Sequence, residues 1–124
     1  MSYRILILDD DTDILFFCSV IFENLGFEVA SVTHCKDIYD QVEKNQPDII
    51  LIDNWIPDIG GTKAIQLLKQ HPVFKEIPVI LFSANNNLPA LAKEAEADNY
   101  LKKPFDLAAI EEMVLNMVKK KLKH

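Results

Sequence analysis

Five short runs of apolar residues, each the length of a β-strand, alternate along the chain with longer amphipathic segments of helical length. The runs cover residues 5–8, 27–32, 49–52, 79–82 and 99–101. The first and third are apolar at every position, which is typical of parallel strands that helices cover on both faces. Because crossovers between parallel strands are right-handed, few topologies remain. The pattern predicts an open, doubly wound α/β sheet of five parallel strands with five flanking helices.

Helix-capping signals stand between the predicted strands. Asp11 or Thr12 can cap the first helix, which should stop at Gly26. Asp106 should cap the last helix, where apolar residues recur at helical spacing. A chain of 124 residues, 49% of them hydrophobic, can bury one real core. We therefore predict a single domain over residues 1–124.

Composition narrows the possible partners. A net charge of -6 disfavours direct nucleic-acid binding, which needs clustered Lys and Arg. No apolar run approaches the ~20 residues of a membrane span, and the first residues lack a signal-peptide pattern. We therefore expect a cytoplasmic protein that binds neither nucleic acid nor membrane. Cys18 and Cys35 are expected to be small buried side chains, not a disulfide or a metal site.

Reactive side chains follow four of the five predicted strands. In open parallel sheets, ligands bind just beyond the carboxyl ends of the strands, so these residues should share one edge. The residues are Asp9-Asp10 after the first strand, Asp53 after the third, Ser83 after the fourth and Lys102-Lys103-Pro104 after the fifth. Each one alone is as easily a cap, a turn or a solvated surface residue. Their convergence on one edge favours a functional site.

The residue types at this edge suggest phosphoryl chemistry. Three neighbouring carboxylates repel one another, and Mg²⁺ with its oxygen ligands relieves that repulsion. A carboxylate beside Mg²⁺ can attack phosphorus to form an acyl phosphate, if other groups neutralise the charge on the phosphoryl oxygens. The Ser83 hydroxyl and the Lys103 ammonium suit that task.

Four motifs in the same order resemble the receiver domains of bacterial response regulators, over essentially the whole chain. Asp9-Asp10 resembles the acidic pair after the first strand, and residues 50–57 with Gly61 resemble the phosphoacceptor segment and its loop. Phe82-Ser83-Ala84 resembles the switch hydroxyl segment, and residues 100–105 resemble the lysine motif with its switch aromatic. Together the four motifs are a strong signal. The resemblance implies a flavodoxin-like sheet with strand order 2-1-3-4-5.

The resemblance also implies the roles of the acidic residues. Asp53 would be the phosphoacceptor in a phosphorelay, with Asp10 as a direct ligand of the Mg²⁺ cofactor and Asp9 reaching the metal through water. The backbone carbonyl of Trp55 would complete the protein's share of the metal site. The Trp55 side chain would either pack across the mouth of the site or meet a partner.

The remaining implied residues form a switch. Ser83 and Lys103 would hold the phosphoryl group, and Tyr100 would move inward in response. The output would be a rearranged face of helix four, strand five and helix five. The donor would be a sensor histidine kinase or a histidine phosphotransfer protein, and the recipient a downstream protein target or an output domain. The chain would be either a stand-alone receiver or a piece of a longer regulator, and it would catalyse only its own phosphorylation and dephosphorylation.

Two departures from the family lie in the output region. The segment between Ser83 and Lys103 is shorter than usual and contains Asn85-Asn86-Asn87, so we expect a short or displaced fourth helix. Glu96 stands where the family most often has glycine, so this helix must end in some other way.

The first helix suggests a docking surface. We assign its core stripe at helical spacing to Ile14, Phe17, Cys18, Ile21 and Leu25. Apolar Leu15, Phe16 and Val20 then remain near the outer side. We hypothesise that Leu15 and Phe16 dock the phosphohistidine donor; the alternative is that both are buried between the first and last helices.

Two other functions compete with the receiver. Asp9-Asp10-Asp11-Thr12 also looks like the nucleophile motif of haloacid-dehalogenase-type phosphatases, with Asp9 as nucleophile and Asp11 as acid/base. Those enzymes commonly carry a cap insertion and a second acidic pair, and neither is evident. A flavodoxin-like cofactor-binding module is the other alternative, but the chain has only three glycines and no Ser/Thr/Gly-rich phosphate loop after the first strand.

Overall fold

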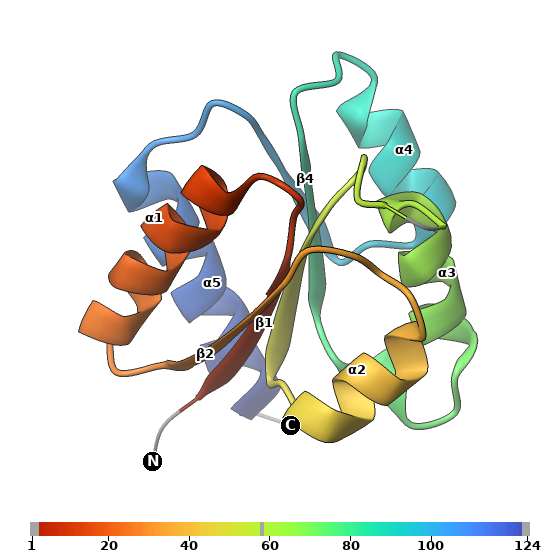
Figure 1. Cartoon of the computed structure of the whole chain (residues 1–124), viewed down its shortest axis with the longest axis horizontal. Helices are drawn as coiled ribbons and strands as arrows, with labels where there is room; N and C mark the ends of the chain where they lie inside the picture. Colours follow the sequence, from red (N-terminus) through yellow and green to blue (C-terminus); the bar gives the residue numbers. More distant parts are fainter. Residues whose placement is uncertain (1–2, 58, 123–124) are drawn as a thin grey trace.

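The computed structural model describes residues 3–57 and 59–122, with the side chains described as far as residue 119. Strands and helices alternate strictly along the chain (Figure 1). The strands are β1 (Arg4–Leu8), β2 (Glu28–Val32), β3 (Ile49–Asp53), β4 (Val79–Ser83) and β5 (Asn99–Lys102). The helices are α1 (Thr12–Asn24), α2 (Ile38–Asn45), α3 (Gly61–Gln70), α4 (Leu88–Ala95) and α5 (Leu107–Leu122), with a 3-10 turn at Phe74–Glu76.

All strands pair in parallel, in the order β2-β1-β3-β4-β5. This confirms the predicted doubly wound sheet and the flavodoxin-like order that the resemblance implied. Each predicted strand differs from the observed one by one residue at one of its two ends. Phe27, which was assigned to the second strand, precedes it and packs its ring against Phe22, with 5.5 Å between ring centroids.

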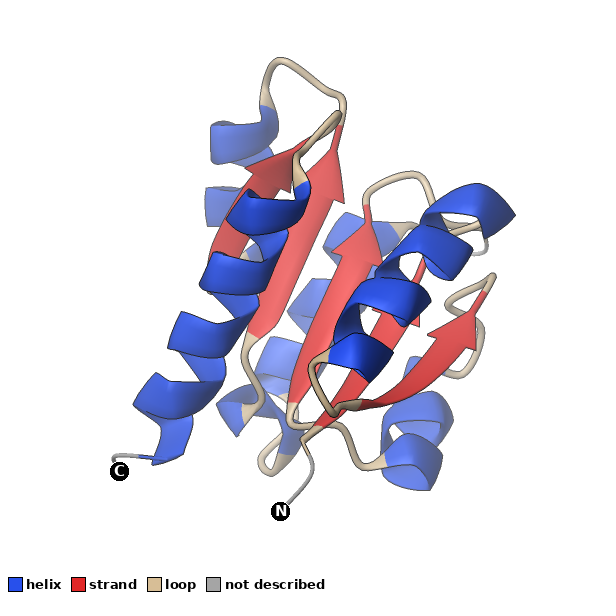
Figure 2. Ribbon diagram, turned by 90° about the vertical axis from the view of Figure 1, so that its left-hand side faces the viewer, coloured by secondary structure: helices blue, strands red, loops and turns tan. Residues whose placement is uncertain are grey.

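The central strands bury both of their faces, and successive residues enter opposite halves of the core. Helices lie on both sides of the sheet (Figure 2). Residues such as Leu6, Leu8 and Ile50 pack with α2, α3 and α4. The alternate residues, such as Ile5, Ile7 and Ile49, pack with α1 and α5. The two-residue period of a strand therefore explains why these runs are apolar at every position.

Helix α1 buries a different face from the one predicted. Leu15 is 7% exposed and belongs to the core shared with α5, whereas Phe17 and Leu25 are exposed. The predictions that Leu15 lies outside and that Phe17 and Leu25 lie inside are therefore wrong. The core positions of this helix are Leu15, Cys18, Ile21 and Phe22. Apolar residues occur almost all round α1, so its pattern alone did not determine which side faces the sheet.

The helix ends follow the capping signals. Asp11 caps α1, because its carboxylate accepts the amides of Asp13 and Ile14 at 2.9 and 3.4 Å. The Asp106 carboxylate accepts the amide of Ala109 at 2.8 Å in the first turn of α5. Helix α4 has only 8 residues, which confirms the expected shortening. It ends at Ala95, and the residue that follows, Glu96, takes the left-handed conformation (φ 64°) that glycine usually occupies.

Both cysteines are buried and free, as predicted. Burial raises the pKa of the Cys18 thiol to about 12, and the nearby Asp9 carboxylate adds to the effect. Among the described residues, no helix has the length and apolar character needed to cross a membrane.

Candidate functional site

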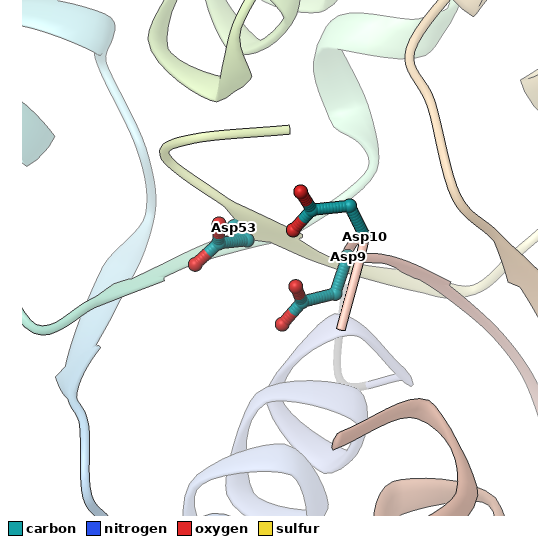
Figure 3. A group of neighbouring side chains, drawn as sticks. All are labelled: Asp9, Asp10 and Asp53. Atoms are coloured by element: carbon teal, nitrogen blue, oxygen red, sulfur yellow. The ribbon is translucent and has the colours of Figure 1, made fainter. Parts of the chain in front are cut away.

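The predicted reactive residues meet at the carboxyl edge of the sheet. Asp9 and Asp10 follow β1, Asp53 ends β3, Ser83 ends β4 and Lys103 follows β5. Figure 3 shows the three aspartates grouped at the ends of β1 and β3. These strands are neighbours in the sheet, so residues more than forty positions apart in the sequence come together there.

Lys103 connects the two buried carboxylates of the group. Its Nζ lies 2.8 Å from Asp9 Oδ2 and 2.9 Å from Asp53 Oδ1. Asp9 is fully buried and Asp53 is 5% exposed. The same ammonium lies 4.7 Å from the centroid of the Phe82 ring, which covers it from one side. Lys103 is therefore held by charge and by packing at the centre of the site.

The other oxygen of each buried carboxylate accepts a backbone amide. The amide of Trp55 donates to Asp53 Oδ2 at 3.0 Å. The amide of Asp11 donates to Asp9 Oδ1 at 3.0 Å. Every oxygen of the two buried carboxylates therefore has a donor, and such hydrogen bonds hold a carboxylate in one orientation.

Burial and pairing compete in setting the proton affinities of this site. Burial raises the pKa of Asp9 above its ordinary value, and it outweighs the hydrogen bonds from Lys103 and the Asp11 amide. Burial would lower the pKa of Lys103, but its hydrogen bonds to Asp9 and Asp53 outweigh this effect and leave the pKa raised. Lys103 is therefore a firmly charged ammonium at neutral pH.

The three aspartates form a suitable donor set for a hard divalent cation. Asp9, Asp10 and Asp53 each offer a carboxylate oxygen, and these oxygens lie within 4.8 Å of one another. Asp10 is exposed, so the group is open to solvent on one side. One ammonium cannot neutralise three carboxylates, and the excess negative charge favours a cation with oxygen ligands, such as Mg²⁺.

The predicted switch residues occupy different environments. Ser83 is fully buried, and its Oγ accepts the amide of Asn85 at 3.1 Å. Tyr100 lies on β5 with its side chain substantially exposed. Trp55 is 71% exposed on the loop after β3. The structure thus places Ser83 at the site edge and leaves Tyr100 and Trp55 facing solvent.

Glycine at position 61 is explained by a close approach. A Cβ atom on Gly61 would lie 2.2 Å from the backbone oxygen of Asp53, so any side chain there would displace α3 or the end of β3. The first turn of α3 therefore packs directly against the backbone of Asp53 and Asn54.

Sequence reasoning missed two contacts that hold the loop after β3. The Thr62 hydroxyl donates to Asn54 Oδ1 at 2.5 Å. The amide and Sγ of Cys35 both donate to the carbonyl of Pro57, at 3.2 and 3.0 Å. The one sequence signal for these contacts was that Asn54 directly follows Asp53. Thr62 and Cys35 are distant from Asp53 in the sequence, and only the tertiary structure brings them to this loop.

The phosphatase alternative is not favoured by this geometry. The Asp11 carboxylate, its expected acid/base, is engaged as the cap of α1. Asp9, its expected nucleophile, is fully buried. The fold and the site together define a doubly wound α/β domain with an acidic pocket and a lysine at the carboxyl edge of its sheet.

The chain matches the family model of the response regulator receiver domain over residues 5–115. It belongs to this family, and receiver domains are signalling modules of two-component systems that interact with sensor histidine kinases and output domains. It is 32% identical over 111 residues to the transcriptional regulatory protein PrrA of Mycobacterium tuberculosis, covering 88% of this chain and 47% of that protein.

A second relative is named as a sensor kinase/phosphatase. The chain is 29% identical over 107 residues to the CAI-1 autoinducer sensor kinase/phosphatase CqsS of Vibrio cholerae, covering 83% of this chain and 16% of that protein. It spans about half the length of PrrA and a smaller share of CqsS.

Solved structures agree with the fold. The CheY-like response regulator receiver domain protein of Methanospirillum hungatei has a TM-score of 0.88 and 27% identity, covering 99% of this chain and 98% of that one. The receiver domain of the sensor histidine kinase PA1611 of Pseudomonas aeruginosa, solved with a magnesium ion in its active-site cleft, has a TM-score of 0.86 and 21% identity, covering 96% and 99%. The likeness to PA1611 shows the fold alone.

Proposed function

We propose that the chain is a single receiver domain that accepts a phosphoryl group on Asp53 from a phosphohistidine partner, with Mg²⁺ as cofactor. The observation that carries this proposal is the bridge from Lys103 Nζ to Asp9 and Asp53, at 2.8 and 2.9 Å. It places a charged ammonium beside the proposed nucleophile, where negative charge would accumulate on the phosphoryl oxygens.

The transfer needs no base, because the nucleophile is a carboxylate. An oxygen of Asp53 attacks the phosphorus, the P–N bond of the phosphohistidine breaks, and its electron pair leaves with the imidazole nitrogen, which takes up a proton. Lys103 shifts its hydrogen bond from Asp53 to a phosphoryl oxygen, and the Ser83 hydroxyl donates to another. Loss of the group follows when water attacks the phosphorus and restores the carboxylate, releasing inorganic phosphate.

The aspartates would hold the metal. Asp10, Asp53 and the carbonyl of Trp55 are the proposed direct ligands, with Asp9 reaching the ion through water. When bound, Mg²⁺ supplies neutralisation of the phosphoryl charge. The proposal that Mg²⁺ binds here is supported by Asp9, Asp10 and Asp53, which offer carboxylate oxygens within 4.8 Å of one another.

The proposed consequence is a two-state switch. In the free domain, Ser83 Oγ accepts the Asn85 amide, and Tyr100 is exposed. A phosphoryl oxygen gives the Ser83 hydroxyl an acceptor, which draws the β4–α4 loop toward the site and opens space for Tyr100 to move inward. The face of α4, β5 and α5 then presents a changed surface to a downstream target or output domain.

The chemistry can be tested with a small acyl-phosphate donor and Mg²⁺, read by intact mass. We expect the wild-type chain to gain the mass of one phosphoryl group and Asp53→Asn to gain none. Asp40→Asn, an exposed aspartate on α2, is the matched control and should react like the wild type. An unmodified wild-type chain, or phosphorylated Asp53→Asn, would contradict the proposal.

We propose that the donor docks on the exposed face of α1 at Phe16. Leu15, the other predicted docking residue, is buried and cannot contact a partner there. Phe16 is 73% exposed. Phe17 lines a groove of about 280 Å³ next to Lys103, together with Pro104 and Phe105. An apolar partner surface placed here would lie beside the phosphoacceptor pocket.

Phe16→Ser should slow transfer from a phosphorylated histidine kinase about tenfold, within the range of a moderate hot spot. Its reaction with a small acyl phosphate should stay unchanged. Val73→Ser, another exposed apolar residue on the chain, is the matched control. An equal loss with both donors would argue against docking at Phe16.

A further inference from the structure

The residue after the phosphoacceptor is held by three hydrogen bonds. The Asn54 amide donates to the carbonyl of Phe82 on β4 at 3.2 Å, and its carbonyl accepts the amide of Gly61 at 3.0 Å. Its side-chain Oδ1 accepts the Thr62 hydroxyl at 2.5 Å. Asn54 is therefore fixed to β4 on one side and to the first turn of α3 on the other.

The peptide group that joins Asn54 to Trp55 transmits this restraint to the site. Its carbonyl oxygen accepts from Gly61, and its N–H donates to Asp53 Oδ2 at 3.0 Å. A trans peptide is planar, with the carbonyl and the N–H pointing in opposite directions. Fixing the carbonyl on α3 therefore directs the N–H at the Asp53 carboxylate.

Thr62 is well placed to stabilise this peptide. Gly61 has no side chain, and the close approach to the Asp53 backbone allows none. Thr62 is thus the first residue of α3 whose side chain can hold the loop, and it does so at the Asn54 amide oxygen. Both residues are half-buried and uncharged, so their hydrogen bond is only partly weakened by water.

We propose that Thr62 and Asn54 are positioning residues for phosphorylation, because their hydrogen bond orients the Asn54–Trp55 peptide. The N–H of this peptide holds Asp53, and the carbonyl of Trp55, one peptide further along, is the proposed metal ligand. This proposal rests on the proposed function of Asp53. Neither residue touches the phosphoryl group; both act through the Asn54–Trp55 peptide.

The test uses Trp55, the single tryptophan of the chain, as a fluorescent reporter of Mg²⁺ titrated into the intact protein. Thr62→Val keeps the shape of the side chain and removes its hydroxyl. We expect the half-saturating Mg²⁺ concentration to rise about fivefold, the effect of one neutral hydrogen bond. Phosphorylation by a small acyl phosphate at subsaturating Mg²⁺ should slow by a similar factor.

Three further variants separate positioning from a general structural effect. Thr62→Ser restores the hydroxyl and should bind Mg²⁺ like the wild type. Asn54→Leu combined with Thr62→Val should bind no more weakly than Asn54→Leu alone, because the two residues act through one bond. Thr33→Val, an exposed threonine in the β2–α2 loop, is the matched control and should change nothing.

Wild-type Mg²⁺ affinity in Thr62→Val, or fully additive losses in the double variant, would overturn the proposal. So would a weakened affinity in Thr62→Ser equal to that of Thr62→Val. If the wild-type chain gains no phosphoryl group, the proposed function fails. If it gains one while Thr62→Val matches it in both assays, only the positioning role fails.

Discussion

The edge formed by β1, β3 and β5 and the side formed by the β4–α4 loop and α4 are held in different ways. At the edge, Asp9 and Asp53 are buried and joined by Lys103 across the sheet. On the other side, the exposed Lys102 donates a hydrogen bond to Asn86 Oδ1 in the β4–α4 loop at 2.8 Å.

The proposed switch needs this difference, because it combines a fixed pocket with a segment that can move. Buried charges joined across strands cannot shift without large cost, because an unpaired charge in the core is strongly disfavoured. Exposed loop hydrogen bonds exchange readily with water, so such a segment opens at low free energy. We therefore expect the pocket to be the rigid part and the β4–α4 loop to be the part that rearranges in the proposed switch.

The largest expected effect comes from removing the central ammonium. Lys103→Met leaves two buried carboxylates facing each other without a cation. We expect the free energy of unfolding to fall by about 3 kcal/mol in the presence of a chelator, measured by urea denaturation. Phosphorylation of Asp53 should also be lost.

The neighbouring lysine is the matched control for that variant. Lys102→Met removes the exposed bond to Asn86 and should change the unfolding free energy by no more than about 0.5 kcal/mol. Equal destabilisation by both substitutions would remove the distinction between a rigid edge and a loosely held side.

The next effect is stabilisation by Mg²⁺. An ion that binds only the folded state should raise the unfolding free energy by about 2.7 kcal/mol at one hundred times its dissociation constant. Urea denaturation with and without Mg²⁺ measures the shift. Asp10→Asn should reduce it strongly, while Asp13→Asn, on the first turn of α1, should leave it intact. A shift that survives Asp10→Asn would place the ion elsewhere.

Asp9 should make stability depend on pH in the metal-free protein. Its raised pKa means that folding favours the protonated form; this stabilisation is complete below the ordinary pKa of about 3.9 and is lost as the pH rises through the folded-state value. Asp9→Asn should therefore be more stable than the wild type at pH 7, by about 1 kcal/mol.

That advantage should shrink as the pH is lowered toward 4, about the ordinary pKa of an aspartate. Urea denaturation at both pH values, in a chelator, gives the comparison. If the stability advantage of Asp9→Asn over the wild type grew as the pH was lowered, folding would favour the ionised form of Asp9, and the prediction would be contradicted.

An effect of similar size to that of Asp9→Asn concerns the end of α4. Glu96 occupies a left-handed conformation (φ 64°) that costs an L-residue with a side chain more than it costs glycine. Glu96→Gly should raise the unfolding free energy by about 1 kcal/mol, measured by thermal and urea denaturation. Glu94→Gly, within the same helix, should instead lower it by about 1 kcal/mol. A gain from both would show that backbone strain at Glu96 is not the cause.

Much of the fold could be read directly from the sequence because its strands and caps are local signals. Runs that are apolar at every position identified the strands, and Asp11 and Asp106 stand where the helices begin. The buried face of helix α1 was predicted wrongly, since Leu15 faces the core and Phe17 does not. An apolar residue on most sides of a helix leaves its orientation to be decided by what it packs against.

The site was predictable to the extent that its residues follow strand ends. Asp9, Asp53, Ser83 and Lys103 lie at one edge of the sheet as expected. The contact of Thr62 with Asn54 was not predictable, because no local pattern shows that the first turn of α3 packs against the end of β3.

The sequence by itself determined which residues are the candidates for the proposed chemistry, since residue type and position after a strand are properties of the chain. Only the tertiary structure decided how those residues are oriented and charged. Burial raises the pKa of Asp9, the hydrogen bonds that Lys103 donates to two carboxylates raise its own pKa, and one peptide directs its N–H at Asp53. The physical reason is that desolvation and hydrogen-bond geometry depend on neighbours that the fold brings together from distant parts of the sequence.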